Sequence, residues 1–432
     1  MVAVLCAATG LNAQTINALI GEKKVPIRVV SVNVDVKVLG NVATTTMDIV
    51  FRDDSSRTLE GELNFPLAAG QSVTRFAMEI NGKMREGVVV EKEKGRSTFE
   101  SIVRRGVDPG LLEMTKGNNF KARVYPLLAN KTKRIIVAYE EVLSSDESSQ
   151  TYRLPLNFPD ELESFKLKAT VYSKFKSPSV SGDYAKDLDF DKDEDAWIAT
   201  TSRSDYKAQS QFVFTVPLDN AAPQIFTEEF NGKTYFNISF IPTLPAKAKA
   251  MPKNLALYFD VSSSRGTANI TKELELLAEY LKKAGNCQVT LFKFANKQQA
   301  GVEYRISNGN SDKLIADLKK QRFDGGTSLG NIKIEKGRFD EIWICSDGIG
   351  NFGSKEIKDL HTPIYCINSN QSAEHNLMQA ISETSGGAYI NLMQYDTEKA
   401  LNILINQVPK ILAVEYDKNS IEEVNNFNKL NY

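Results

Sequence analysis

The chain has 432 residues, a length that exceeds one small core and indicates about two to four domains. Hydrophobic residues make up 42% of it and charged residues 25%, as in folded globular domains, which excludes a disordered or collagen-like chain. The net charge of -1 lacks the basic excess that binding to nucleic acid or to an anionic membrane requires, so neither is expected as a partner. No apolar run is long enough to span a bilayer, and the sequence predicts no membrane span.

Residues 1–14 are expected to be a signal peptide. Val2–Ala8 is apolar and Ala13 precedes a candidate cleavage position, a pattern typical of exported proteins. The usual basic start is missing, so the given start could lie inside a longer signal, and the alternative is an ordinary N-terminal segment. We expect an exported protein, located in the periplasm, on the cell surface or outside the cell.

Residues 25–145 alternate apolar and polar residues with the period of antiparallel strands. The clearest example is Arg28–Val36, and Asn81–Gly82 is a turn signal between two later runs. Glu91–Arg104 is the one stretch with helical character. This part is predicted to be a β-sandwich with one helix.

Residues 146–250 continue with strand-like runs and form a predicted β-rich connecting region. Within it, Ser181–Asp195 carries aspartates at alternate positions, which invites a calcium-loop interpretation. The central glycine and terminal glutamate of the EF-type loop do not fit, and this favours a solvated acidic loop. Prolines between Pro242 and Pro252 mark a linker.

The pattern changes at residue 252, where apolar strands begin to alternate with amphipathic helices. This alternation predicts an α/β doubly wound (Rossmann-like) domain over 252–410, with a mainly parallel sheet. The expected strands are 254–259, 287–294, 301–306, 341–348, 362–368 and 388–392. The expected helices are 271–284, 311–320, 376–384 and 397–408. One more strand-like run is Ile411–Tyr416, within a C-terminal extension of 411–432, and it could be a return strand or the start of a further domain.

Oxygen-bearing side chains gather at one predicted edge of this sheet, where doubly wound folds bind ligands. Asp260, Ser262 and Ser264 follow the first strand, Thr327 lies in a glycine-rich loop, and Asp347 follows a later strand. Carboxylate and hydroxyl oxygens suit a hard divalent cation, Mg²⁺ first, with Mn²⁺ and Ca²⁺ as alternatives. Each residue alone has a plainer interpretation, such as a helix cap or a turn, but the ordered set favours a metal site.

This set resembles the metal-ion-dependent adhesion site (MIDAS) of the von Willebrand A (vWA) family. The family's D-x-S-x-S motif matches Asp260, Ser262 and Ser264, its loop threonine matches Thr327, and its later aspartate matches Asp347. The resemblance covers about residues 254–410. It implies a metal ligated directly by hydroxyls and one carboxylate, and a protein partner that supplies an acidic residue to the cation.

Segments in the first third of the chain resemble, in order, the VIT domain, the vault-protein and inter-alpha-trypsin-inhibitor heavy-chain domain. They are Leu59–Leu67, Ser72–Gly82, Gly87–Lys92, Phe99–Glu100, Leu111–Glu113, Asn119–Pro126 and Ala138–Leu143. We expect these residues to be core strands and turns, and we assign no chemistry to them. A VIT domain followed by a vWA domain is also the arrangement of the inter-alpha-trypsin-inhibitor heavy chains and related bacterial secreted proteins.

The expected function is therefore binding or adhesion and not catalysis. The matched motif offers no general base that is not itself a metal ligand, and the chain has only two histidines, His361 and His375. A scaffold whose metal fastens loops and a metal-assisted hydrolase are the alternatives. Ser263 and Arg265 stand where many bacterial vWA members have Gly and Met, and Arg265 could weaken cation binding by repulsion or help to grip an acidic partner.

The cysteines within the predicted α/β domain lie in apolar strand-like runs. Cys287, Cys345 and Cys366 are expected to be buried free thiols. A Cys345–Cys366 disulfide is an alternative that the sequence leaves open, since both could lie on neighbouring strands. The sequence contains no cysteine and histidine cluster with zinc spacing, so no cofactor beyond the divalent cation is expected.

Overall fold

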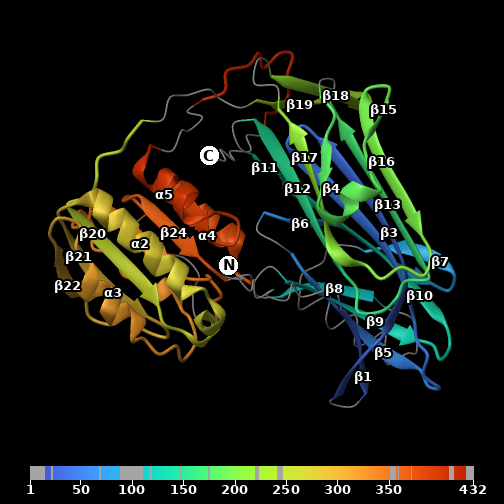
Figure 1. Cartoon of the computed structure of the whole chain (residues 1–432), viewed down its shortest axis with the longest axis horizontal. Coiled ribbons are helices and arrows are strands. Elements are labelled where there is room, and N and C mark those ends of the chain that lie inside the picture. Colours follow the sequence, from blue (N-terminus) through green and yellow to red (C-terminus); the bar gives the residue numbers. More distant parts are fainter. Residues whose placement is uncertain are drawn as a thin grey trace, which may run out of the picture.

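The computed structural model describes residues 15–20, 23–67, 70–87, 110–115, 119–145, 148–173, 176–218, 223–240, 247–350, 357–358, 360–370, 372–407 and 413–424. It has a β-rich part, from β1 (Thr15–Ile20) to β19 (Lys233–Ser239), and an α/β part, from β20 (Asn254–Asp260) to α5 (Thr397–Ile405) (Figure 1). Within the described residues, no helix is long and apolar enough to cross a membrane.

The β-rich part is built from three larger sheets and one separate hairpin. Its other strands are β2 (Lys23–Pro26), β3 (Arg28–Leu39), β4 (Val42–Arg52), β5 (Leu59–Pro66), β6 (Ser72–Ile80), β7 (Lys83–Glu86), β8 (Gly110–Thr115), β9 (Asn119–Leu127), β10 (Thr132–Val142), β11 (Ser144–Ser145), β12 (Ser149–Asn157), β13 (Ser164–Tyr172), β14 (Ser179–Ser181), β15 (Asp191–Asp193), β16 (Ala196–Arg203), β17 (Gln209–Pro217) and β18 (Gln224–Phe230). The strand orders are β15-β16-β13-β3-β4-β10-β6-β7, β2-β1-β5-β9-β8 and β11-β12-β17-β14.

Buried side chains alternate with more exposed ones along the central strands of the largest sheet, and this alternation explains why these residues form strands. Along β3, the valines at positions 32, 34, 36 and 38 are at most 1% exposed, and each is stabilised by roughly 1.5–3 kcal/mol relative to an exposed valine. β13 pairs in parallel with β3 over its whole length, from Ser164↔Ser31 to Tyr172↔Leu39. One apolar core therefore extends from Ile27 to Val216, across the predicted limit at residue 145.

The acidic segment of the β-rich part is more ordered than a plain loop. It contains the 3-10 helix η1 (Gly182–Lys186) and β15, which pairs with β16. Leu188 and Phe190 are buried and hold the segment to the core, whereas the aspartates at 187, 189, 191, 193 and 195 are all exposed. This exposure agrees with solvated carboxylates. The helix expected at Glu91–Arg104 lies outside the described residues.

The hairpin of β18 and β19 stands apart from the other sheets in its hydrogen bonding. Its turn residues Asn231 and Gly232 both have positive φ, as a tight hairpin turn requires. Nearby, the Nζ atom of Lys233 lies 2.7 Å from Oε2 of Glu422, in the segment that follows α5. The strand expected at Ile411–Tyr416 is wrong for residues 413–416, which do not pair with any described strand.

The α/β part is a six-stranded sheet in the order β22-β21-β20-β23-β24-β25, parallel except for β22. Its other elements are η2 (Ser263–Thr267), α2 (Ile270–Ala284), β21 (Cys287–Phe294), β22 (Val302–Ile306), α3 (Asp312–Lys319), η3 (Leu329–Asn331), β23 (Glu341–Cys345), β24 (Ile364–Asn368), α4 (His375–Ser385) and β25 (Tyr389–Asn391). The doubly wound prediction is confirmed. The strand order reverses between β20 and β23, where such sheets bind ligands.

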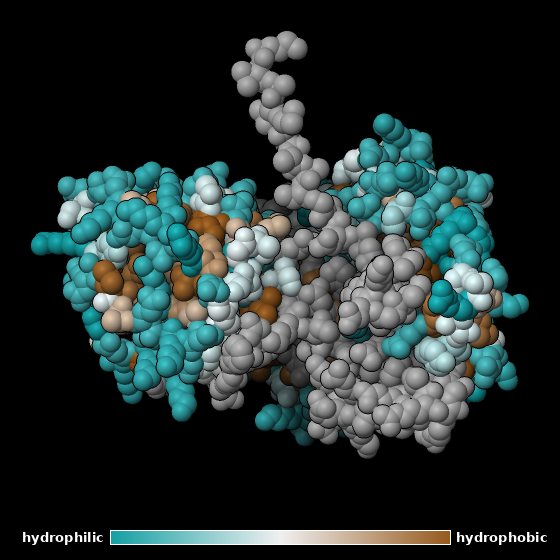
Figure 2. Space-filling model, turned by 90° about the horizontal axis from the view of Figure 1, so that it is seen from below, coloured by the Kyte–Doolittle hydropathy of each residue, from teal (hydrophilic) through white to brown (hydrophobic). Residues whose placement is uncertain are grey.

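Helices cover both faces of this sheet. Leu255 and Leu257 pack on the side of α2, α3 and α5, whereas Ala256 and Tyr258 pack on the side of α4. The successive residues of β20 thus enter two separate cores, which explains its continuous apolar run. Seen from below, the outer surface of the described residues is mostly hydrophilic, with smaller hydrophobic areas (Figure 2).

The chain enters and leaves the α/β part at the same place. Lys249 N donates to the carbonyl of Ile405 at 3.0 Å, and Gln407 N donates to the carbonyl of Lys247 at 2.7 Å. The Lys249 ammonium also pairs with the buried Glu341 carboxylate at the start of β23. Burial lowers the pKa of Lys249, and Glu341 counteracts this effect. The linker is therefore fastened to the amino edge of the sheet.

The three cysteines of the α/β part are free and buried, as expected. β23 and β24 are neighbours, but Cys345 lies opposite Ile367 and Cys366 lies opposite Ile344. Cys345 belongs to the core on the α2 side and Cys366 to the core on the α4 side. The alternative of a Cys345–Cys366 disulfide is wrong, because adjacent positions on neighbouring strands point to opposite faces.

Candidate metal site

Asp260 ends β20 and is completely buried. Its Oδ1 accepts a hydrogen bond from Ser262 N at 2.9 Å, and its Oδ2 accepts one from Ser346 Oγ at 2.6 Å. Burial raises the pKa of Asp260, the hydrogen bonds from Ser346 and Ser262 lower it, and the nearby Asp347 raises it further. The carboxylate is thus held in place by hydrogen bonds, and the positive charge close to it, on Arg265, forms its ion pair with Glu273.

The loop after β20 brings two hydroxyls to the same edge. Ser262 Oγ and Ser264 Oγ lie 3.2 Å apart, one buried and the other half-buried. Ser263 is exposed, and both its main-chain N and its Oγ donate to the carbonyl of Gly325 at 2.9 Å. These two bonds fix the segment Val261–Arg265, which we call the serine loop, against the loop that carries Thr327.

Thr327 is completely buried, and its Oγ1 has no hydrogen-bond partner among the described residues. Its loop is shaped by Gly325, which has a φ of 80°, and by Gly326 N, which donates to Asn296 Oδ1 at 3.0 Å. Thr327 also forms a parallel bridge with Gly350, in the loop after Asp347. A buried hydroxyl without a partner is costly, so this oxygen is available to a ligand.

Asp347 follows β23 and is completely buried. Its Oδ1 accepts from Ile349 N and its Oδ2 from Asn370 Nδ2, both at 3.0 Å. The next residue, Gly348, has a φ of 71°, and an added Cβ there would lie 3.0 Å from Met378 Sδ. The turn that aims Asp347 at the edge therefore depends on this glycine.

The five predicted residues all lie at the carboxyl edge of the sheet, at the end of β20 or in the segments that follow the strands. Asp260, Ser262 and Ser264 are joined by the contacts above, and Asn370 joins Asp347 to the serine loop. Thr327 reaches the same loop through the Gly325 carbonyl, without a direct bond to the other four. Within the described residues, no three or more His, Cys, Asp or Glu side chains form a metal-binding group. A metal here would thus depend on hydroxyls, which fits a hard cation.

Two features of the site were not predicted. Asn370, in the loop after β24, touches both Asp347 and the serine loop. Arg265 does not face a partner: it is completely buried, and its Nη2 lies 2.5 Å from Oε2 of Glu273 on α2. The expectation that Arg265 could grip an acidic partner is wrong, because a carboxylate eight residues along the chain already pairs with it.

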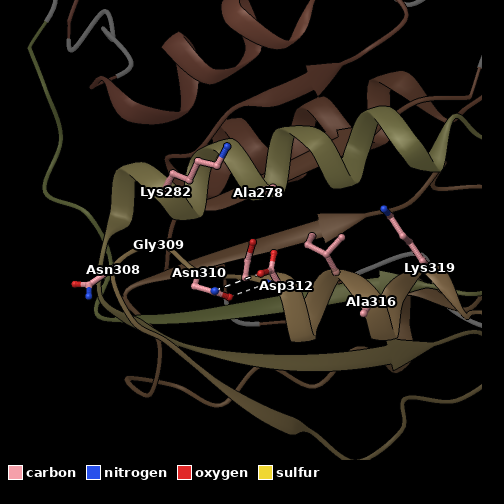
Figure 3. A pocket seen from close by; sticks show the side chains of 10 residues that line it. Ala278, Lys282, Asn308, Gly309, Asn310, Asp312, Ala316 and Lys319 are labelled. Atoms are coloured by element: carbon pink, nitrogen blue, oxygen red, sulfur yellow. Dashed lines mark hydrogen bonds between the residues drawn. The ribbon is translucent and has the colours of Figure 1, made fainter.

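A shallow groove of about 680 Å³ lies elsewhere on the α/β part, between α2 and α3 (Figure 3). Its lining includes Lys282, Lys319 and the stretch from Asn308 to Asp312. Since α2 begins at the carboxyl edge, its C-terminal Lys282 is at the opposite edge of the sheet from the five predicted residues. The groove is separate from the candidate metal site.

Comparison with known proteins identifies a domain family in the first third of the chain. Residues 29–139 match the vault protein inter-alpha-trypsin (VIT) domain family. The doubly wound sheet that follows this match is vWA-like.

Two curated relatives match most of the chain at low identity. The chain is 21% identical to inter-alpha-trypsin inhibitor heavy chain H3 of Rattus norvegicus over 466 residues, covering 93% of this chain and 51% of the relative. It is 22% identical to a von Willebrand factor A domain-containing protein of Dictyostelium discoideum over 427 residues, covering 90% of this chain and 45% of the relative. The chain thus spans about half the length of the curated relatives it matches.

Solved structures give weaker similarities. The protein BatB of Bacteroides thetaiotaomicron is 14% identical, with 35% of this chain and 94% of that chain covered and a TM-score of 0.27. An M1 zinc metallopeptidase of Deinococcus radiodurans is 11% identical, with 68% of this chain and 63% of that chain covered and a TM-score of 0.28. At these TM-scores neither similarity carries a functional conclusion.

Proposed function

We propose that this chain is an exported binding or adhesion protein in which a divalent cation completes a protein–protein contact. The cation, Mg²⁺ first and otherwise Mn²⁺ or Ca²⁺, would be held by Asp260, Ser262, Ser264, Thr327 and Asp347. The acidic residue of a protein partner would complete its coordination. Export rests on the apolar pattern of residues 1–14, and the metal-dependent contact rests on the geometry of the site.

The observation that carries the proposal is the unsatisfied hydroxyl of Thr327. This buried oxygen lies at the same sheet edge as two buried carboxylates and two neighbouring serine hydroxyls. A divalent cation would give the hydroxyl a partner and would neutralise the carboxylates. A single divalent cation would therefore offset both the unsatisfied hydroxyl and the buried negative charge.

The buried charge at this edge supports a divalent ion. Among the described residues, the buried charged side chains there are three carboxylates and one guanidinium, which sum to -2: Asp260, Glu273, Asp347 and Arg265. Glu273 and Arg265 already pair with each other, which leaves the two aspartates. A cation of charge +2 balances them, whereas a monovalent ion would leave one buried charge uncompensated.

The edge is also open enough for a partner. Ser263 is exposed and Ser264 half-buried, so the rim of the site lies at the surface. With only two carboxylates among the five ligands, the bound cation would keep enough positive character to accept another anionic oxygen. That property favours a contact over a closed structural site. It also distinguishes the proposal from a scaffold whose metal only fastens loops.

A metal-assisted hydrolase is the less favoured alternative. Hydrolysis with this metal as a Lewis acid would need a general base close to the cation. Both carboxylates of the candidate site are themselves proposed ligands, and the five residues offer no other base.

The first experiment is a calorimetric titration of Mg²⁺ and Mn²⁺ into metal-stripped protein. We expect saturable binding that Asp260→Ala abolishes and Asp189→Ala leaves unchanged, since Asp189 is an exposed aspartate of the β-rich part. Absence of binding to the unaltered protein would overturn the proposal. Thermal unfolding of both variants checks that the fold persists.

A second experiment separates adhesion from a scaffold. Partners captured by the unaltered protein are compared with those captured after chelation and by Asp260→Ala. Metal that exchanges readily, and that binds more tightly when partner is added, supports adhesion, because binding of metal and partner must be reciprocal. Partner binding that survives both treatments would contradict it.

A further inference from the structure

Asn370 occupies a distinctive position among the residues around the candidate site. Its Nδ2 donates to Asp347 Oδ2 and to the carbonyl of Ser264, both at 3.0 Å. The two bonds connect the loop after β24 with the loop after β23 and with the D-x-S-x-S loop after β20. Asn370 thus contacts both halves of the site across the switch point.

The orientation of the Asn370 amide is fixed by chemistry. Exchanging its oxygen and nitrogen would place the oxygen against a carboxylate of Asp347 and a carbonyl of Ser264, which are both acceptors. Nδ2 must therefore face them, and both of its hydrogens are used. The remaining Oδ1 is buried and has no hydrogen-bond partner among the described residues, in a side chain whose residue is only 4% exposed.

Asn370 is held in this position by its own loop. Its main-chain N donates to Asn368 Oδ1 at 2.9 Å, and Asn368 Nδ2 donates back to its carbonyl at 2.8 Å. The preceding Ser369 Oγ donates to Glu273 Oε1 at 2.6 Å, while the other oxygen of Glu273 pairs with Arg265. Glu273 on α2 thus connects the loop after β24 to the serine loop a second time.

We infer that Asn370 is a positioning residue of the metal site, which orients Asp347 and holds it against the serine loop. The inference rests on the proposed metal-binding function. Asn370 aligns Asp347 before the cation arrives, so that less ordering is needed on binding. Like Thr327 Oγ1, its Oδ1 is buried and has no hydrogen-bond partner among the described residues.

The test compares Mg²⁺ affinity in Asn370→Ala with that of the unaltered protein and of Asn402→Ala, an exposed asparagine on α5. We expect Asn370→Ala to weaken Mg²⁺ binding about 10- to 100-fold, as loss of a residue that orients a metal ligand does. Asn402→Ala should bind as the unaltered protein does. An affinity of Asn370→Ala within about twofold of the unaltered protein would overturn the inference.

A second variant provides a readout that a merely structural role would not change. Asn370→Asp places a carboxylate against Asp347, which should lower the melting temperature of the metal-free protein and enlarge the increase caused by Mg²⁺. An equal Mg²⁺-induced increase in both proteins would contradict a role at the site. If the unaltered protein binds no metal, the proposed function fails, whereas binding that Asp260→Ala abolishes and Asn370→Ala retains defeats only this inference.

Discussion

Ser346 Oγ donates a 2.6 Å hydrogen bond to Asp260 Oδ2, and this bond joins the ends of β20 and β23 at the switch point of the sheet. Ser346 also accepts a bond from Gly348 N at 3.0 Å through the same Oγ. The hydroxyl therefore orders the turn that carries Asp347 while it holds the Asp260 carboxylate. The two proposed acidic ligands are linked before any metal binds.

Asp260→Asn is expected to stabilise the metal-free protein. Burial raises the pKa of Asp260, so this group stabilises the fold fully only below its unfolded pKa, and the contribution is lost as pH rises through the folded pKa. Near neutral pH, the neutral asparagine removes that cost and can still accept from Ser262 N. We expect a melting temperature higher by about 2–4 °C with chelator, from roughly 1 kcal/mol.

The same variant should lose the Mg²⁺-induced rise in melting temperature that we expect of the unaltered protein. Scanning calorimetry with chelator and with Mg²⁺ gives both quantities. A variant that melts well below the unaltered protein in chelator would contradict the interpretation of Asp260 as a buried carboxylate whose charge is costly in the metal-free protein.

Glu273→Gln is expected to destabilise the α/β part strongly. Arg265 and Glu273 are both buried, so the substitution leaves a guanidinium without its countercharge, at a cost of about 3–5 kcal/mol. Glu279→Gln is the matched control on the same helix, because its exposed pair with Lys282 contributes no more than about 1 kcal/mol. Urea unfolding measures the free energy of unfolding of both variants. Similar decreases in the two variants would contradict the interpretation of Arg265 and Glu273 as a buried ion pair.

The thiols should be unreactive in the folded protein. In a Cys6→Ser background, the remaining cysteines are Cys287, Cys345 and Cys366, all free and buried. We expect a thiol reagent such as Ellman's reagent to modify them only as the chain unfolds, and to count three thiols in denaturant. Fewer than three thiols in denaturant without reductant would indicate a disulfide and would contradict the strand register.

Alkaline conditions should weaken the fold. Burial raises the pKa of Cys287 from 9.0 to about 11 and that of Cys366 to about 12. Both thiols stay protonated in the folded state while the unfolded chain loses their protons, so the free energy of unfolding falls as pH rises above 9.0. The slope approaches about 1.4 kcal/mol per pH unit for each thiol. Chemical denaturation between pH 8 and 10.5 tests this, and Cys287→Ala should show a smaller slope.

The elements of the α/β part could be predicted closely because helical and strand periods are local. The expected strand at 287–294 coincides with β21, and the helix expected at 271–284 is α2 with one more residue at its start. The candidate ligands followed from motif spacing. Where they would meet followed from the fold class, since carboxyl ends of parallel strands share one edge.

The features that the sequence did not predict depend on contacts between residues far apart in the chain. Nothing around Asn370 distinguishes it in the sequence, since it approaches Asp347 only through the order of β23 and β24. Arg265 looked exposed because a charged residue in a polar loop usually is, and only the position of Glu273 explains its burial. The parallel pairing of β13 with β3 joins residues more than a hundred positions apart, beyond any local signal.

The pairing of Lys247–Lys249 with Ile405–Gln407 has a mechanical consequence. Both chain connections leave the α/β part side by side at the amino edge, while the proposed cation lies at the opposite edge. A pull applied at the proposed cation would therefore run along the length of the parallel strands before it reached the paired segments at the amino edge.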